Sequence, residues 1–276
     1  MTRASSARAH PAHGSEAVPV PLALMGRLGS GALDIAGGVG RASLFLVRAV
    51  EGAVRPPYRW GLIIEQLHFI GNRSVGIIAL TSAFTGLVLA LQGYNALSRF
   101  GAEQLVGSLV ALSLVRELAP VLGALMVTAR AGSAVAATMG NMRVTEQIDA
   151  LKSMAIDPFG YLVAPRVVAA LVAGPMLTAM FTLTGLGVAQ VFSVHVLRLD
   201  AGAFNHSVST SIKTGDVVEG LSKALVFAVA MIWIATYRGY HARGGAQGVG
   251  QATTRAVVET SVLVLALDYV LTALLF

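Results

Sequence analysis

The chain has 276 residues, of which 55% are hydrophobic and 12% are charged, and its mean hydropathy is +0.71. Soluble domains carry about 25% charged residues, so this composition excludes an ordinary soluble protein and indicates an integral membrane protein. The chain has no cysteine, which excludes disulfides and thiolate metal sites, and its net charge of +6 predicts basic cytoplasmic loops rather than a nucleic-acid partner.

Residues 1–21 are polar, contain scattered prolines and lack the apolar run of roughly 7–15 residues that a secretory signal requires. We predict a disordered cytoplasmic tail for this segment. The following stretch, residues 22–72, is predicted to form interfacial and elbow helices. Its charged residues recur every seven positions, close to two helical turns, and so form one polar stripe on an apolar helix: Arg27, Asp34, Arg41, Arg48 and Arg55.

This striped helix is expected to lie along the membrane surface, with packing against a soluble partner as the alternative. Pro56-Pro57 is predicted to end it. Tyr58, Arg59 and Trp60 then resemble headgroup-level anchors at the start of a short second helix, which closes near Gly71-Asn72.

The remainder, residues 73–276, contains five apolar stretches long enough to cross the hydrocarbon core, which needs about 20 residues. The predicted spans are Ser74–Leu97, Glu103–Thr128, Val167–Val194, Val217–Tyr237 and Ala256–Phe276. The expected fold is therefore an all-α integral membrane protein with an N-terminal interfacial amphipathic helix, five transmembrane helices and a cytoplasmic coupling helix. Fifteen lysines and arginines fall on the N-terminal side and three on the other, which predicts a cytoplasmic N-terminus.

The connection between the second and third spans, Ala129–Arg166, is long and patterned. Gly132, Ala136 and Gly140 repeat at four-residue steps, which predicts close approach of two backbones, either in fixed packing or at a moving contact. Val144–Ile156 is predicted to form an amphipathic helix with Thr145 as its N-cap. Its apolar face would hold Val144, Ile148, Leu151 and Ala155. Such a helix suits docking to a soluble partner, although a solvated loop helix has the same pattern.

Four charged residues lie within otherwise apolar spans: Arg116, Glu117, Lys223 and Asp268. Each costs roughly 2.5–3.5 kcal/mol at bilayer depth and is expected to face a bundle interior or a watery path. Lys223 and Asp268 fall at similar depth, so we predict that they pair, in either a structural or a transport role. Arg116 and Glu117 project about 100° apart. We expect one of them to meet the Lys223–Asp268 region or a second subunit; Arg116 is the candidate for a phosphate contact.

Four apolar side chains share one face of the first span and form a candidate lining for the tails of a lipid substrate, with Phe100 following at the outer mouth of the span: Leu87, Leu91, Tyr94 and Leu97. Ordinary helix packing is the alternative. His195 and His206 are expected at the surface, and no metal site is predicted. A membrane enzyme is another alternative, but the sequence contains neither a catalytic grouping of Ser, His and Asp nor a pair of carboxylates that would support it.

Several motifs strongly resemble the MlaE/YrbE permease family, the membrane subunits of MCE-type lipid ABC transporters. They are Ser113–Leu122 (SLVRELAPVL), Ala129–Ala134 (ARAGSA), Met142–Leu151 (MRVTEQIDAL), Ile156–Pro158, Pro165-Arg166, Gly250–Val258 (GQATTRAVV) and Leu267–Leu274 (LDYVLTAL). The similarity runs from about Trp60 to the C-terminus. The chain departs from the family at Ala119 and Ala129, where glycine is frequent, and at Thr138, where glutamate is common.

The resemblance implies a homodimeric permease of the bacterial inner membrane that moves phospholipids between the inner and outer membranes. It implies a cytoplasmic ABC ATPase, a periplasmic MCE-domain protein and often a small STAS-domain subunit as partners, and no cofactor in this chain. The four charged residues match the family's intramembrane charged positions. The family's coupling helix matches Thr145–Met154, which includes Thr145, Glu146, Gln147, Asp149, Leu151 and Lys152.

The energy source is expected to lie in a partner, because the chain has no G-x-x-x-x-G-K-[ST] phosphate-binding loop. The alternative is an ion-coupled secondary carrier that uses Glu117 and Asp268 as proton sites. Such carriers commonly contain paired internal repeats, and the five unlike spans do not suggest them.

Overall fold

The computed structural model describes residues 37–38, 40–53 and 59–275, and the regular elements in these ranges are helices. The chain divides into two units, residues 1–44 and 45–276. In the first unit, residues 37–38 and 40–44 are helical. The predicted tail, the first part of the striped helix and the Pro56-Pro57 stop lie outside the described residues.

The second unit begins with helical residues 45–53 and a short helix, α2 (Trp60–Ile70), as predicted for the elbow region. The first span follows a 3₁₀ turn, η1 (Asn72–Ser74), and consists of α3 (Val75–Leu97). Two more 3₁₀ turns lead to the second span: η2 (Ser98–Phe100) and η3 (Glu103–Leu105).

The second span is a single helical run with two π-helical turns in it. Its segments are α4 (Val106–Ser113), η4 (Leu114–Leu118), α5 (Ala119–Val127), η5 (Thr128–Gly132) and α6 (Ser133–Val144). The rest of the chain forms α7 (Gln147–Ser153), η6 (Phe159–Val163), α8 (Ala164–His195), α9 (Ala201–Ser211), α10 (Thr214–Tyr240) and α11 (Gly245–Leu275).

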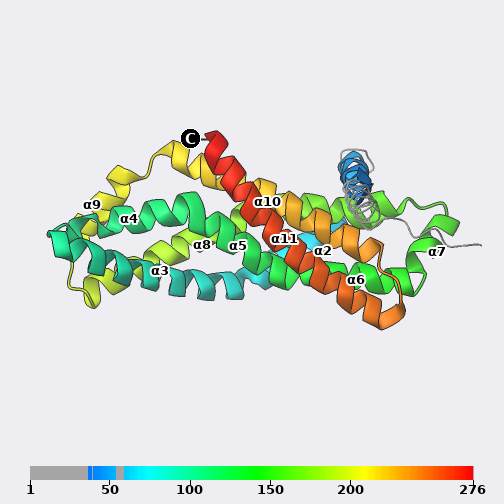
Figure 1. Ribbon diagram of the computed structural model, residues 1–276, viewed down its shortest axis with the longest axis horizontal. Coiled ribbons are helices and arrows are strands. Elements are labelled where there is room, and N and C mark those ends of the chain that lie inside the picture. Colours follow the sequence, from blue (N-terminus) through cyan, green and yellow to red (C-terminus); the bar gives the residue numbers. More distant parts are fainter. Residues whose placement is uncertain (1–36, 39, 54–58, 276) are drawn as a thin grey trace, which may run out of the picture. The chain divides into compact units, whose positions relative to one another are not determined.

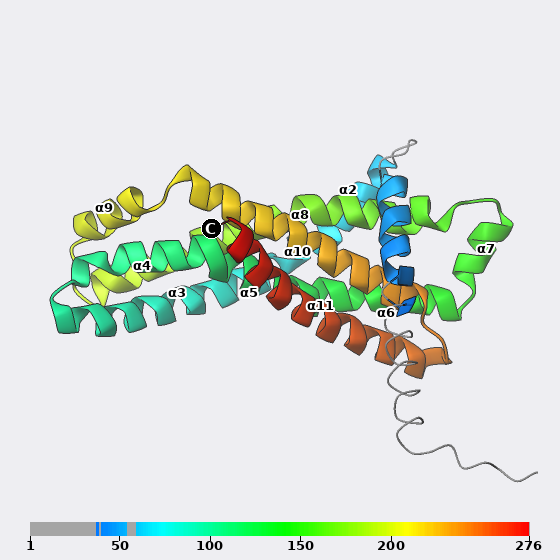
Figure 2. The ribbon, with the colours of Figure 1, turned by 45° about the horizontal axis from the view of Figure 1, so that its top comes forward.

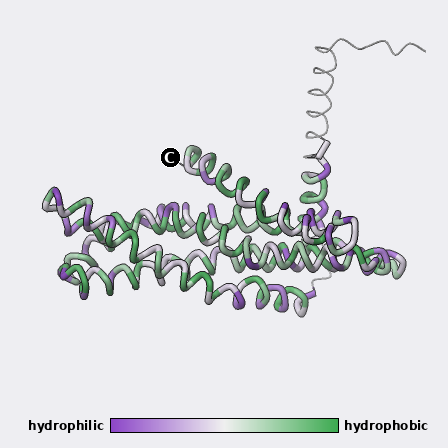
Figure 3. Tube along the Cα trace, turned by 60° about the horizontal axis from the view of Figure 1, so that its bottom comes forward, coloured by the Kyte–Doolittle hydropathy of each residue, from purple (hydrophilic) through white to green (hydrophobic). Residues whose placement is uncertain are grey.

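Five of the described runs are long and apolar enough to cross a membrane, which confirms the predicted number of spans. They are Trp60–Phe100, Glu103–Val144, Phe159–His195, Thr214–Tyr240 and Gly245–Leu274. Several run beyond the predicted boundaries: the second continues to Val144 rather than ending at Thr128, and the last starts at Gly245 rather than Ala256. Hydropathy marks only the part of a helix that contacts lipid, and hydrophilic residues gather toward the ends of the long helices (Figure 3).

Small residues set the packing of these helices. α3 lies along α8, and α10 lies against α6, α8 and α11 (Figures 1 and 2). The buried face of α3 is Ile78, Ser82, Gly86, Ala90 and Gly93. A Cβ at Gly86 would collide with the backbone of Gly185 in α8, so two glycines let these helices touch.

The predicted close packing of the four-residue repeat is confirmed within the bundle. A Cβ on Gly132 would lie 3.3 Å from Met231 Cγ of α10, and one on Gly140 would lie 3.3 Å from Val249 of α11. A Cβ on Gly239 of α10 would lie 2.7 Å from the Ala136 carbonyl oxygen. The repeat therefore runs from the end of η5 along α6, against α10 and α11.

The helix predicted over Val144–Ile156 is wrong in its extent. Val144 ends α6, and α7 covers only Gln147–Ser153. Thr145 does not cap α7, because its Oγ1 donates to the Asn141 carbonyl at 2.8 Å. Glu146 (φ 59°) and Ala155 (φ 58°) are left-handed and interrupt the helix on either side. Of the predicted apolar face, Ile148 is buried and Leu151 half-buried, whereas Val144 and Ala155 are exposed.

Candidate functional site

The π-helical turn η4 carries Arg116 and Glu117 in the second span. Such turns often occur at functional sites because they interrupt regular helix packing. Pro120 lies two residues after the end of η4 and lacks the N–H that would bond the Arg116 carbonyl in a regular α-helix. Instead, Lys223 Nζ donates to that carbonyl at 3.2 Å. The local sequence thus opens the helix where a distant cation bonds to it.

Lys223 lies at the centre of the site, and none of its surface is exposed. Its Nζ donates to Glu117 Oε1 at 2.9 Å and to Thr272 Oγ1 at 2.8 Å. It lies 3.4 Å from Asp268 Oδ1 and 3.7 Å from Glu219 Oε1. The predicted contact between Lys223 and Asp268 is confirmed, and so is the expectation that one of the two neighbours on η4 meets this region.

Arg116 points to a different pair of acids. Its Nε lies 2.9 Å from Asp216 Oδ1 and 3.7 Å from Glu219 Oε2. Neither acid was among the predicted site residues, although Asp216, Glu219 and Lys223 share one face of α10 at positions i, i+3 and i+7. Asp216 fell one residue before the predicted span, and Glu219 fell inside it. Glu219 bridges the two cations, so η4, α10 and α11 hold one charged cluster: Arg116, Glu117, Asp216, Glu219, Lys223 and Asp268.

The charged cluster is graded in exposure. Side-chain exposure is 0% for Lys223, 9% for Asp216 and 10% for Glu219. It rises to 22% for Asp268 and 37% for Glu117, and Arg116 is 31% exposed. The buried side of the cluster is thus internally paired, whereas its outer edge presents two carboxylates and a guanidinium at the surface of apolar helices.

The residues predicted to line a path for lipid tails, on α3 and η2, do not form one uniform surface. Leu91 is 44% and Phe100 83% exposed. Leu87 is half-buried, and Tyr94 and Leu97 are half-buried against the core. The cavities described below are lined by other residues.

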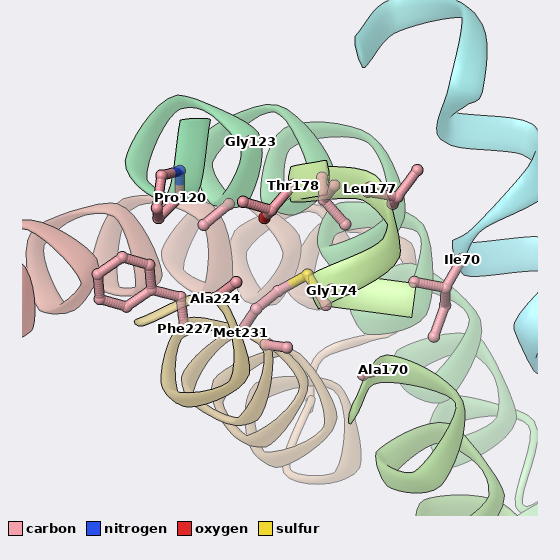
Figure 4. A pocket seen from close by; sticks show the side chains of 13 residues that line it. Ile70, Pro120, Gly123, Ala170, Gly174, Leu177, Thr178, Ala224, Phe227 and Met231 are labelled. Carbon is pink, nitrogen blue, oxygen red and sulfur yellow. The ribbon is translucent and has the colours of Figure 1, made fainter. Parts of the chain in front are cut away.

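A void between α5, α8 and α10 is the interior space shown in Figure 4. Its volume is about 20 Å³, and its walls include Pro120, Gly123, Thr178, Phe227 and Met231. A space of this size holds about one water molecule. It is far too small to hold a lipid.

The predicted coupling helix α7 is tied to its neighbours by charge. Asp149 accepts hydrogen bonds from Arg143 Nη1 of α6 at 2.8 Å and from Lys152 Nζ at 3.0 Å. The bonds from Lys152 and Arg143 lower the pKa of Asp149, and the bond to Asp149 raises the pKa of Lys152. Lys152 Nζ and the Arg143 guanidinium lie 5.9 and 6.0 Å from the ring centre of Tyr240 on α10.

Tyr240 belongs to an aromatic cluster that was not predicted from the sequence. Its ring centre lies 5.6 Å from those of Phe45 and Phe159, and His241 and Tyr237 complete the group. These residues come from three segments of the chain, so no periodicity could have brought them together. The cluster joins the helical residues 45–53, η6 and α10 beside α7.

The family model described as Permease MlaE matches residues 63–274. The chain belongs to the MlaE permease family. A probable ABC transporter permease protein of Rickettsia felis is 44% identical over 249 residues, covering 90% of this chain and 96% of the relative. The intermembrane phospholipid transport system permease protein MlaE of Haemophilus influenzae is 41% identical over 250 residues, again covering 90% and 96%.

A more distant relative is the chloroplastic protein TRIGALACTOSYLDIACYLGLYCEROL 1 of Arabidopsis thaliana, 34% identical over 235 residues, or 85% of this chain and 66% of that protein. As an MlaE-family permease, the chain is a multi-pass membrane subunit of an ABC transporter. It is not itself the ATPase, so ATP hydrolysis belongs to a partner subunit.

Proposed function

We propose that this MlaE-family permease moves phospholipid between the inner and outer membranes of a bacterial envelope and works as a homodimer. The proposal draws on the phospholipid transport named for the Haemophilus relative. Its physical support is the outer edge of the charged cluster, where Arg116, Glu117 and Asp268 are partly exposed on apolar helices.

Contact of that edge with hydrocarbon is energetically unfavourable, because a charged group that faces lipid tails loses its hydration. A phospholipid headgroup offers polar atoms to Arg116 and Glu117, while its tails suit the apolar helices around them. A second copy of the chain would cover the remaining surface. In α11, which carries Asp268, only 11% of the most apolar stretch is buried, against 44% in α10.

Energy would enter through α7. We place this helix and the N-terminus in the cytoplasm, where Glu146, Gln147 and Asp149 are exposed for docking to the ATPase. Tyr240 connects α7 to α10, and α10 carries Lys223 toward its other end, so one unbroken helix joins the docking region to the charged cluster. On the opposite side we propose a periplasmic MCE-domain protein, and on the cytoplasmic side a STAS-domain subunit in addition to the ATPase.

Reconstitution tests this function. The permease and its ATPase would be placed in donor vesicles with a fluorescent phospholipid and the MCE-domain protein, with acceptor vesicles outside. We expect lipid transfer with ATP and none with an ATPase variant that binds ATP without hydrolysing it. Transfer driven by a proton gradient alone would reject the proposal in favour of an ion-coupled carrier.

A further inference from the structure

A second cavity lies on another part of the molecule, between α2 and α8. Its volume is about 460 Å³, within the roughly 300–1,000 Å³ of typical ligand sites. α2 and the turn after it supply Ile64, Leu67, His68, Gly71 and Asn72 to the wall, and α3 and α8 supply Val75, Ala173, Met176, Leu177 and Met180. No member of the charged cluster lines it.

The cavity is apolar along its length and polar at one point. Eight of its ten lining residues are aliphatic, methionine or glycine, and the other two, His68 and Asn72, are adjacent. Asn72 Nδ2 lies 3.3 Å from His68 Nδ1, and within the described residues these side chains hydrogen-bond only each other. Both are exposed, so the second amide N–H of Asn72 and the other ring nitrogen of His68 are available to a ligand.

One side of the cavity is exposed, and the opposite side is buried between the helices. Ile64 is 63% and Met176 64% exposed, whereas Ala173 at its floor is 1% exposed. Gly71 also lies at the floor, where an added Cβ would be 3.6 Å from the Ala173 Cβ. Small residues thus hollow the contact between α2 and α8, and flexible methionines line its outer side.

We propose that this cavity binds one acyl chain of a membrane phospholipid, with the phosphate oxygens held by His68 and Asn72. Size favours a lipid chain over a partner's helix. A helix is about 10–12 Å wide with its side chains, so this volume holds only about one helical turn. A thin acyl chain fits the apolar walls, and its polar end meets the two donors where α2 gives way to α3. The site is separate from the charged cluster and does not depend on the proposed transport.

The test uses a phospholipid with a photoactivatable group on its acyl chain, placed at increasing mole fraction in nanodiscs that hold the full-length permease. Labelled peptides would be identified by mass spectrometry. We expect labelling of residues 64–75 and 173–180 to saturate at low mole fraction. Labelling at Val191, an exposed α8 residue outside the cavity, should rise in proportion to the probe.

Met176→Trp fills the mouth, and Val191→Trp is the matched control, because Val191 is 60% exposed on the same helix. Displacing two buried methylene groups weakens binding about tenfold, so the first variant should lose saturable labelling and the control should keep it. Asn72→Leu should lower labelling by the phospholipid more than labelling by a diacylglycerol probe that lacks the phosphate.

Equal, unsaturable labelling of all lipid-facing peptides would overturn the proposal, and so would an unchanged Met176→Trp variant. A photocrosslinker at position 176 in native membranes gives the remaining outcome. An adduct with a protein rather than with lipid would assign the cavity to a partner's helix. These readouts measure occupancy without ATP, so a failure of transport leaves them interpretable.

Discussion

The two ends of α10 are held in place by different kinds of interaction. Toward its start, Asp216, Glu219 and Lys223 form buried ion pairs with η4 and α11. At its other end, Tyr240 contacts aromatic rings and two cations beside α7. Lys223 and Tyr240 are seventeen positions apart, or about 25 Å along the helix.

The difference bears on how each end responds to change. In a low-dielectric interior, removal of one ion leaves its partners uncompensated, so the charged cluster favours one arrangement strongly. Aromatic and cation–π contacts are each worth only about 0.5–1.5 kcal/mol and tolerate shifts in geometry. On the proposed function, the end near α7 therefore adapts to the ATPase, while the charged end holds its geometry. The second span has two π-helical turns, η4 within the charged cluster and η5 directly before α6.

The largest effect is expected from Lys223→Met, at the charged end of α10. It leaves Glu117, Glu219 and Asp268 without their shared cation, and breaking a buried pair costs about 3–5 kcal/mol. We expect a large loss of thermal stability in detergent. Lys223→Met combined with Glu117→Gln should recover part of it. A melting temperature unchanged by the single substitution would contradict the central role of Lys223.

Glu117→Lys places a second cation where an acid now lies 2.9 Å from Lys223. Glu117 is 37% exposed, so the new side chain has room to turn outward and the complex should still assemble. We expect phospholipid transfer to fall to background in the reconstituted assay. Glu117→Gln, which keeps a hydrogen-bond acceptor, should retain a measurable rate. Wild-type outer-membrane barrier function in the lysine variant would refute the assignment.

At the other end of α10, Tyr240→Leu removes the ring that Arg143 and Lys152 face. Several weak contacts are lost, so we expect a destabilisation of about 1–3 kcal/mol. ATP-driven transfer should fall more than ATPase binding. Val258→Leu, an exposed change on α11, serves as the control. A Tyr240→Leu variant with full transfer would show that this contact does not couple α7 to α10.

Two acidic residues at α7 allow docking to the ATPase to be distinguished from packing within the chain. Glu146 is exposed and forms no salt bridge among the described residues, whereas Asp149 bonds Arg143 and Lys152. Glu146→Lys should weaken ATPase capture in a pull-down without changing thermal stability. Asp149→Lys should weaken capture and also loosen α7. Undiminished capture by both variants would exclude α7 as the docking helix.

The smallest effect concerns pH. Hydrogen bonds from Lys152 and Arg143 lower the pKa of Asp149, so its stabilisation is present above its usual value of 3.8 and is lost as the pH falls through the lower, folded-state pKa. The pKa of Lys152 is raised, so its stabilisation is complete below 10.5 and is lost as the pH rises through the higher value. ATPase capture should therefore stay constant between these limits. A midpoint near neutral pH would point to another group.

Much of the fold followed from the sequence, because an apolar run long enough to cross a bilayer has few alternatives to a helix. The number of spans, the elbow helix α2 and the pairing of Lys223 with Asp268 were all predicted. The extent of α7 was not, because the Thr145 hydroxyl bonds back to Asn141 and left-handed residues flank the helix. Asp216 was missed because it lies one residue before the predicted span, and Glu219 was missed although it lies inside that span and shares a helix face with Lys223.

By itself the sequence determined which segments cross the membrane and which ionisable residues lie at bilayer depth, since both depend on local composition. Tertiary structure alone decided the partners: Glu117 turns to Lys223, Arg116 turns to Asp216, and Tyr240 lies beneath the cations of α6 and α7. These choices depend on the π-helical turn and on glycine contacts between helices far apart in the chain. A shift of one residue in either would rotate every side chain that follows by about 100°.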